Sequence, residues 1–68
     1  MRLKEAIERV DKKYYGNPAI IMRGKEYLIR CVFASLRDLP KFFSYEIEDD
    51  NKPFDICPDG KTLIFRVK

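Results

Sequence analysis

The stretch Asn17–Ala34, NPAIIMRGKEYLIRCVFA, decides the fold of this chain. Two runs rich in β-branched and aromatic residues, 19–23 and 26–34, flank the dipeptide Gly24-Lys25. Glycine tolerates the positive φ that the first position of a type II′ turn requires, so the pattern predicts a β-hairpin with a two-residue loop. Arg23-Gly24 is the other possible two-residue loop, and it sorts the side chains onto the same two faces. With Gly24-Lys25 as the loop, Arg23 lies directly opposite Glu26, which is a favourable cross-strand pair.

The same register sorts the hairpin side chains onto two faces. One face has no charged residue and is therefore predicted to face the core. Its members are Ile20, Met22, Tyr27, Ile29, Cys31 and Phe33. The other face is predicted to point outward, and its members are Ala19, Ile21, Arg23, Glu26, Leu28, Arg30, Val32 and Ala34.

A helix is predicted before the hairpin, over residues 2–15. Its apolar residues recur at three- and four-residue spacing and form one stripe. They are Leu3, Ala6, Ile7, Val10 and Tyr14. Gly16 is placed as a helix terminator, and Pro18 prevents the helix from continuing.

After the hairpin the pattern is less regular. Residues 36–43 suit one short helix or helical turn, but Pro40 opposes a helix that begins as early as Ser35. Residues 43–48 alternate strictly between apolar and polar, which predicts a strand with Phe43, Tyr45 and Ile47 facing inward. Two further strands are predicted at 54–57 and 62–67. A four-residue loop, 58–61, joins them and pairs Ile56 with Leu63.

These elements predict a single α+β domain over residues 1–68, with the N-terminal helix packed on one face of a four- to five-stranded antiparallel sheet. The sheet is expected to be antiparallel because its connections are short. If 36–43 is a helix, the order is a permuted ferredoxin-like arrangement. If it is only a turn, a small SH3-like or Sm-like barrel is the alternative.

The composition indicates a folded, cytoplasmic protein. The chain is 46% hydrophobic and 37% charged, which is enough apolar material for one small core. No apolar run is long enough to span a membrane, and the charges of the first eight residues argue against a signal peptide. Cys31 and Cys57 are therefore expected to be reduced, with Cys31 in the core phase of its strand.

The residue types needed for catalysis are scarce. The chain has no histidine, so nucleophile–histidine arrangements are excluded and the commonest metal ligand is absent. The three glycines, at 16, 24 and 60, are isolated turn residues and do not form a phosphate-binding loop. We therefore expect no enzymatic activity, no cofactor, no metal and no small-molecule substrate.

Acidic residues gather in the segment 46–59, which holds six of them and one lysine for a net charge of −5. The rest of the chain therefore carries +8. A divalent-cation site with oxygen ligands is one interpretation. The one we favour is a solvated turn and strand face, because the segment lacks the spacing of a calcium-binding loop.

The outward sheet face is the surface that folding explains least. We expect it to bind a protein partner or a second copy of the chain, because its aliphatic residues lie among arginines. The candidate residues are Ile21, Arg23, Leu28, Arg30, Val32, Ile64 and Arg66. The alternative is a sequence-tolerant RNA- or DNA-binding domain that uses Arg23, Lys25, Arg30 and Arg66.

Overall fold

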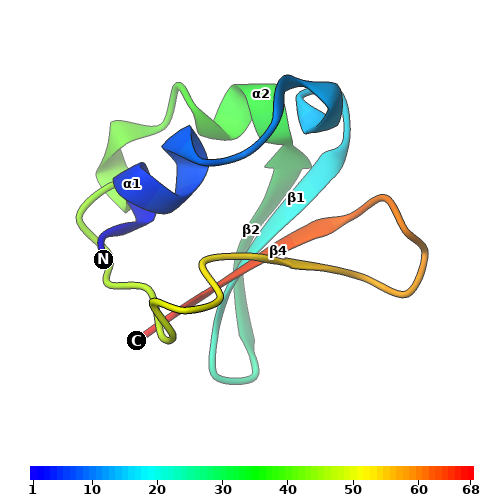
Figure 1. The fold of residues 1–68 in the computed structure, drawn as a ribbon. Helices are drawn as coiled ribbons and strands as arrows, with labels where there is room; N and C mark the ends of the chain where they lie inside the picture. The colour runs from blue at the N-terminus through cyan, green and yellow to red at the C-terminus, as the bar shows by residue number, and fades with distance from the viewer.

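A computed structural model describes all residues 1–68 and contains one four-stranded sheet with short helices on one of its sides (Figure 1). In chain order the elements are α1 (Leu3–Glu8), the 3-10 turn η1 (Lys12–Tyr14), β1 (Pro18–Arg23), β2 (Glu26–Val32), α2 (Phe33–Leu36), the 3-10 turn η2 (Pro40–Phe42), β3 (Asp55–Ile56) and β4 (Leu63–Val67). The α+β class expected from the sequence is confirmed.

The sheet is mixed, with the strand order β2-β1-β4-β3. The pairs β1–β2 and β3–β4 are antiparallel, whereas β1 and β4 are parallel. The expectation of a purely antiparallel sheet was therefore wrong. It considered only connections between consecutive strands, but β1 and β4 are joined by the long segment 24–62, which is ample for a parallel crossover. Neither the ferredoxin-like nor the barrel arrangement is confirmed, since both assumed antiparallel neighbours.

The turn of the β1–β2 hairpin is as predicted. Gly24 has a φ of 62°, and no residue other than glycine has positive φ, so Lys25 does not share this conformation. This combination fits a type II′ turn and excludes type I′, which needs positive φ at both positions. Arg23 pairs with Glu26 in the ladder, and their side chains form an ion pair of 3.1 Å.

A β-bulge beyond the turn changes which side chains share a face. Met22 pairs with Tyr27, but the next residue of β1, Ile21, pairs with Ile29, so Leu28 is an extra residue in β2. An extra residue reverses the alternation of faces on either side of it. Ile29 and Cys31 consequently lie on the same face as Ile21, while Tyr27 lies on the opposite face.

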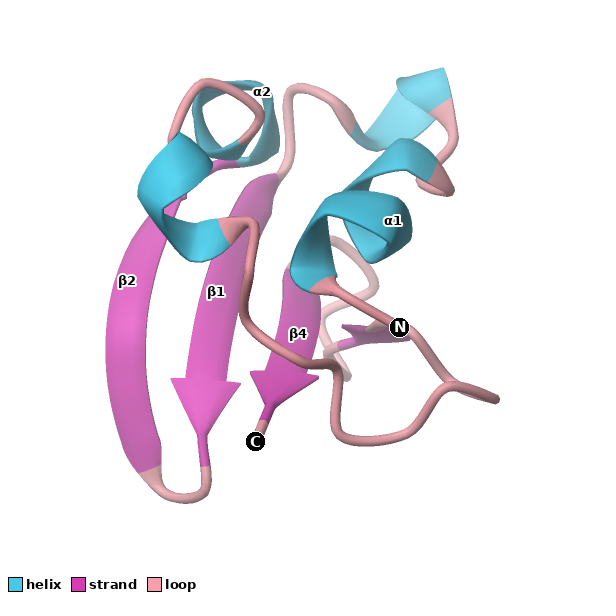
Figure 2. Ribbon diagram, turned by 90° about the vertical axis from the view of Figure 1, so that its left-hand side faces the viewer, coloured by secondary structure: helices cyan, strands magenta, loops and turns pink.

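The core lies between the helix-covered face of the sheet and the helical elements (Figure 2). Ile21, Leu63 and Phe65 are fully buried there. Phe65 stacks on Phe33 of α2, with ring centroids 6.0 Å apart. Thirteen buried residues form this cluster: Leu3, Ala6, Ile7, Val10, Ala19, Ile21, Phe33, Leu36, Phe42, Ile47, Leu63, Phe65 and Val67.

The N-terminal helix is shorter than predicted, although its apolar stripe is buried as expected. α1 ends at Glu8, and the backbone turns before η1 begins at Lys12. The Asp11 carboxylate accepts a hydrogen bond of 3.0 Å from the Lys13 backbone N–H and so begins a new turn. A helix-capping aspartate competes with continuation of the helix, which explains the interruption.

The structure has two short helical elements after β2, and the first begins earlier than predicted. α2 begins directly after β2, so the predicted strand residues Phe33 and Ala34 belong to a helix, in which Phe33 is buried. Ser35 lies inside α2 and makes no cap. The predicted range 36–43 holds the last residue of α2 and the single helical turn η2, where Pro40 occupies a first-turn position that tolerates a missing N–H.

Residues 43–48 keep the predicted alternation of burial but not a full strand. They make isolated bridges, Arg2 with Glu46 and Ile47 with Val67. The Ile47 N–H donates to the Met1 carbonyl at 2.8 Å, and the Glu48 N–H donates to the Arg66 carbonyl at 2.9 Å. This segment therefore joins the start of the chain to the end of β4.

The β3–β4 turn has the predicted four-residue loop, and Ile56 pairs with Leu63. Asp59 organises this loop. Its carboxylate accepts hydrogen bonds from the backbone N–H groups of Lys61 and Thr62 at 2.8 and 2.9 Å and from the Thr62 hydroxyl at 2.7 Å. These bonds lower the pKa of Asp59 to about 2, because they stabilise the ionised carboxylate.

Candidate functional site

The side of the sheet opposite α1 is called here the open face. Residues paired directly across strands point to the same side, so the ladders identify its members. They are Pro18, Ile20 and Met22 of β1, Tyr27, Arg30 and Val32 of β2, Asp55 of β3, and Ile64 and Arg66 of β4. None of the hydrophobic residues among them belongs to the core cluster or packs against it.

Apolar side chains run across the middle of the open face. Ile20 and Ile64 are neighbours on β1 and β4, and Ile20 is only 7% exposed. Because Ile20 is outside the core cluster, the surrounding sheet side chains bury it. Val32 and Tyr27 of β2 are 47% and 66% exposed, and they are the two exposed large hydrophobic residues of the protein.

The charged residues of the open face surround its apolar middle: Arg30 and Asp55 lie on the edge strands β2 and β3, and Arg66 lies near the end of the inner strand β4. On the β3 side, Asp55 contacts Arg66 at 3.3 Å and Lys52 at 3.4 Å. A hydrogen bond from the Ile56 N–H, together with these two cations, holds the pKa of Asp55 below its ordinary value. On the β2 side, Arg30 is exposed and takes part in none of the ion pairs of the structure.

The structure places four of the seven predicted site residues on the open face. They are Arg30, Val32, Ile64 and Arg66. Ile21 does not belong there, because it is fully buried in the core. Leu28 is the bulge residue and packs against the core cluster. Arg23 is exposed at the end of the hairpin, in the phase of Ile21, and pairs with Glu26.

Sequence reasoning missed Ile20, Met22 and Tyr27, which it assigned to the core. The hairpin register from the turn is correct as far as Met22 and Tyr27, and the bulge then shifts it by one residue. Bulges often contain glycine, whereas leucine at position 28 gives no such signal. Arg30 gives no signal either, because the predicted register without a bulge already puts it on the outward face. Only its cross-strand partner differs, and in the structure that partner is Ile20.

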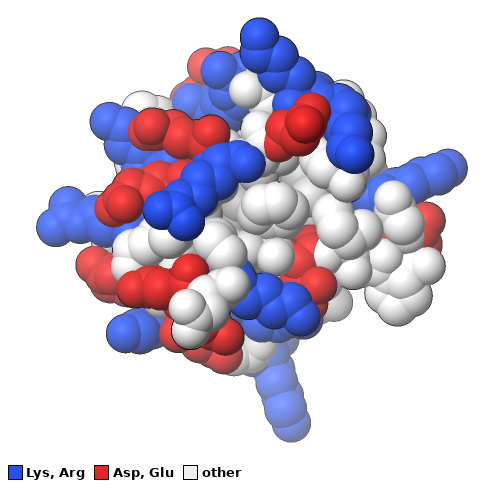
Figure 3. Space-filling view, viewed as in Figure 1, with Lys and Arg blue, Asp and Glu red and all other residues white.

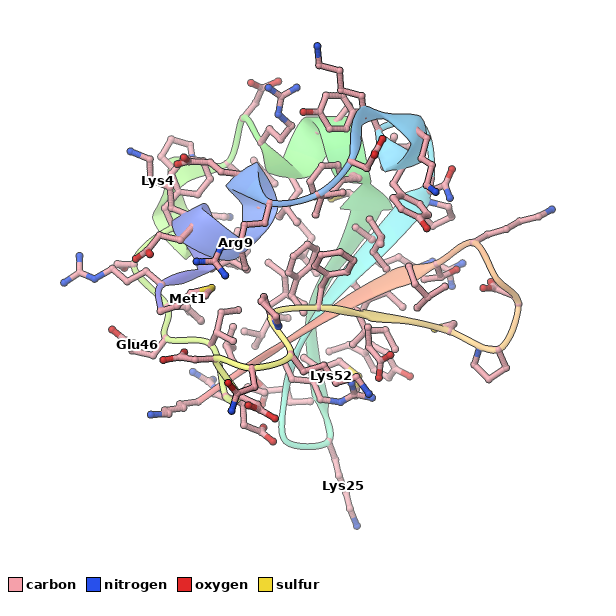
Figure 4. All side chains as sticks on the ribbon, in the orientation of Figure 1. Met1, Lys4, Arg9, Lys25, Glu46 and Lys52 are labelled. Carbon is pink, nitrogen blue, oxygen red and sulfur yellow. The ribbon has the colours of Figure 1, made fainter.

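Other charged side chains lie away from the open face or at its margin. Lys, Arg, Asp and Glu side chains alternate over α1 and the neighbouring chain on the left of Figure 3, so this surface has no dominant sign. Lys25 projects alone from the hairpin tip (Figure 4). Glu46 lies beside Met1 in the same view, and its carboxylate is 3.8 Å from both the Met1 ammonium and Arg2.

The acidic segment 46–59 is occupied by local contacts. The Asp50 carboxylate accepts a hydrogen bond of 2.5 Å from the Met1 ammonium, which lowers the pKa of Asp50. Asp49 accepts a hydrogen bond from the Asn51 N–H at 2.9 Å. No three carboxylate or thiol groups come together in a way that could hold a metal ion. The segment thus contributes turn caps and ion pairs to the fold.

The largest hollow, with a volume of about 670 Å³, lies between α1 and α2 and not on the open face. Its charged side chains are of both signs: Lys4, Glu8, Arg37 and Asp38. The Arg37 guanidinium stacks over Tyr15 at 4.4 Å from the ring centroid. A smaller hollow of about 150 Å³ borders the open face between Asp55, Ile64 and Arg66.

The cysteines and the helices add two further observations. Cys31 and Cys57 are both free, and partial burial raises the pKa of the Cys31 thiol. None of the helices has the length and apolar character needed to cross a membrane. Comparison with known proteins adds no relative, since no family model, no curated protein and no solved structure matches this chain.

Proposed function

We propose that this protein is a small, non-enzymatic interaction module of the cytoplasm that binds a protein surface through the open face of its sheet. The observation that carries the proposal is the position of Tyr27 and Val32. Both exposed large hydrophobic residues lie on this one face, beside the apolar pair Ile20–Ile64. An apolar centre with Tyr, Met and Arg around it is the composition typical of protein interfaces.

The arrangement of charge supports the same function. Arg30 and Asp55 lie on the edge strands and Arg66 lies near the end of β4, so the charged residues surround an aliphatic centre, as in an interface with a polar rim. Arg30 has no partner within the chain, so a carboxylate of a bound protein would complete its hydrogen bonding.

Affinity capture from a native lysate tests the proposal. The immobilised wild type is compared with Val32→Glu, which puts a charge on the open face. Ser35→Glu is the matched control, because it puts the same charge on an exposed residue of α2, away from the open face. We expect a protein, or the chain itself, to bind the wild type and the control, and to bind Val32→Glu at least ~tenfold less, or ~1.4 kcal/mol. Equal binding to all three would contradict the proposal.

Binding of single-stranded nucleic acid is a second candidate, because Tyr27 is on the outward side and 66% exposed, where a base could stack. It ranks second because Arg23 and Arg66 already pair with Glu26 and Asp55. Fluorescence anisotropy with a labelled single-stranded RNA tests it at ~50 mM and ~200 mM salt. This function requires binding that weakens steeply with salt and with Tyr27→Ala, and no binding at the lower salt would exclude it.

A further inference from the structure

The open face carries a row of four residues that crosses all four strands. The ladders pair Arg30 with Ile20, Ile20 with Ile64, and Ile64 with Asp55. The row therefore begins with a cation on edge strand β2 and ends with an anion on edge strand β3. Two isoleucines separate the charges. Reversing the row end for end exchanges its charges and leaves its aliphatic centre in place.

From this row we infer that a second copy of the chain covers the open face, related to the first by a two-fold axis that runs parallel to β1 and β4 between the two sheets. The inference rests on the proposed function and names its partner. In the second copy, such an axis reverses the order of the strands across the sheet but leaves each residue at the same height along its strand. Each Arg30 then faces Asp55 of the second copy, and each Ile20 faces Ile64.

The charges decide between the two ways of packing this face on itself. A two-fold axis perpendicular to the strands would place Arg30 against Arg30 and Asp55 against Asp55, and like charges placed face to face oppose association. The parallel axis converts both contacts into attractive pairs. Both axes keep the strands of the two sheets close to aligned, as in aligned face-to-face packings, so the charges alone decide between them.

The groups at the two ends of the row are suited to this contact. Arg30 forms no ion pair within its own chain, so its guanidinium is free to donate. The Asp55 side chain is 35% exposed. Its Oδ2 contacts Lys52 and Arg66, and its Oδ1 accepts a hydrogen bond from the Ile56 N–H. A carboxylate has about four lone-pair sites, so about one remains for a guanidinium.

The size of the face predicts a weak dimer. The molecule measures 25 × 24 × 21 Å. One face therefore covers on the order of 500 Å² per copy, or ~1,000 Å² in total, at the lower limit for a specific interface. Contacts of this size are transient, so association is expected to become visible only at high concentration.

Sedimentation velocity over a concentration series up to ~1 mM tests the inference. At ~1 mM protein, even a dimer with a millimolar dissociation constant is populated enough to be detected. The wild type is expected to approach the dimer mass. Arg30→Glu and Asp55→Lys should each dimerise at least ~tenfold more weakly, because each variant creates two like-charge contacts. An equimolar mixture of the two variants should associate again, since the introduced glutamate then meets the introduced lysine.

A wild type that stays monomeric at every concentration overturns the inference, as does a mixture that associates no better than its components. If circular dichroism shows that Asp55→Lys is unfolded, the test is the comparison of Arg30→Glu with the wild type. Dimerisation of Arg30→Glu as strong as that of the wild type would then contradict the inference. If the wild type is monomeric but still captures another protein, and Val32→Glu weakens that capture, then only the dimer is contradicted and the proposed function stands. If the wild type is monomeric and captures no protein, the proposed function is contradicted too.

Discussion

The two faces of the sheet carry similar aliphatic side chains but differ in what covers them. On one face Ile21, Leu63 and Phe65 are fully buried beneath the helical elements. On the other, Ile20 and Ile64 lie directly side by side with no helix above them, and the neighbouring Val32 is half exposed. The difference shows that apolar composition alone does not identify the core of a small sheet. The core is the face that helices cover.

Truncating one side chain on each face gives the largest expected contrast. Ile21→Ala leaves a cavity in the core and should cost ~2–5 kcal/mol, enough to unfold much of a domain of this size. Val32→Ala removes a half-exposed side chain and should change the free energy of unfolding by less than ~0.5 kcal/mol in the monomer. Urea unfolding of both variants, at dilute protein concentration, measures the contrast. Equal losses would contradict the assignment of the faces.

Deleting Leu28 tests the bulge that separates the faces. If Leu28 is the extra residue, its deletion leaves every other pair of the hairpin in place and costs only its own contacts, ~1–3 kcal/mol. Deleting Cys31, in the regular part of β2, is the control. It moves Val32 and the fully buried Phe33 back by one position, which should turn Phe33 out of the core and prevent folding.

Nuclear Overhauser effects between Met22 and Tyr27 provide the measurement for the Leu28 deletion. We expect the deletion variant to keep these contacts, as in the wild type. A folded variant in which Tyr27 has moved next to a core residue would show that β2 has no bulge at this position.

A smaller effect, on the pH dependence of stability, concerns Asp59 in the loop between β3 and β4. The pKa of Asp59 is about 2 in the folded protein, below its ordinary value of 3.8. The unfolded chain therefore takes up the proton first, so the stability due to this carboxylate is present above pH ~4 and is lost as the pH falls toward 2.

Asp59→Asn removes the ionised acceptor and should lower the melting temperature at pH 7. The difference from the wild type should narrow as the pH falls from ~4 to ~2, because the wild-type carboxylate is then protonated too. Thermal unfolding at several pH values measures both proteins. A difference that does not depend on pH would mean that the ionised form of Asp59 does not hold the loop.

Local patterns in the sequence predicted the local structure well. The glycine and the Arg23–Glu26 pair defined the first turn, and the loop 58–61 placed Ile56 opposite Leu63. The alternation over 43–48 was also correct as a pattern of burial. These features depend on neighbours in the chain, so the order of residue types was sufficient to infer them.

The errors concern contacts between distant segments. The parallel pairing of β1 with β4 depends on how residues 24–62 cross the sheet, and no local pattern reports it. The bulge at Leu28 lets Ile29 and Cys31 face the core while Tyr27 faces outward, which a strict period of two cannot represent. The assignment of side chains to the two faces was therefore correct in part. The residues C-terminal to the bulge and those on β4 were assigned to the proper face, and those near the turn were not.

Methyl NMR with a soluble paramagnetic agent tests the central claim most directly, because it reports the exposure of both faces in one experiment. The methyl signals of Val32 and Ile64 should be strongly broadened in dilute protein and become protected as the concentration rises to ~1 mM, where we expect the proposed dimer to form. Those of Ile21 and Leu63 should be protected at every concentration. Broadening of Val32 and Ile64 that does not change with concentration would contradict the account, as would strong broadening of Ile21.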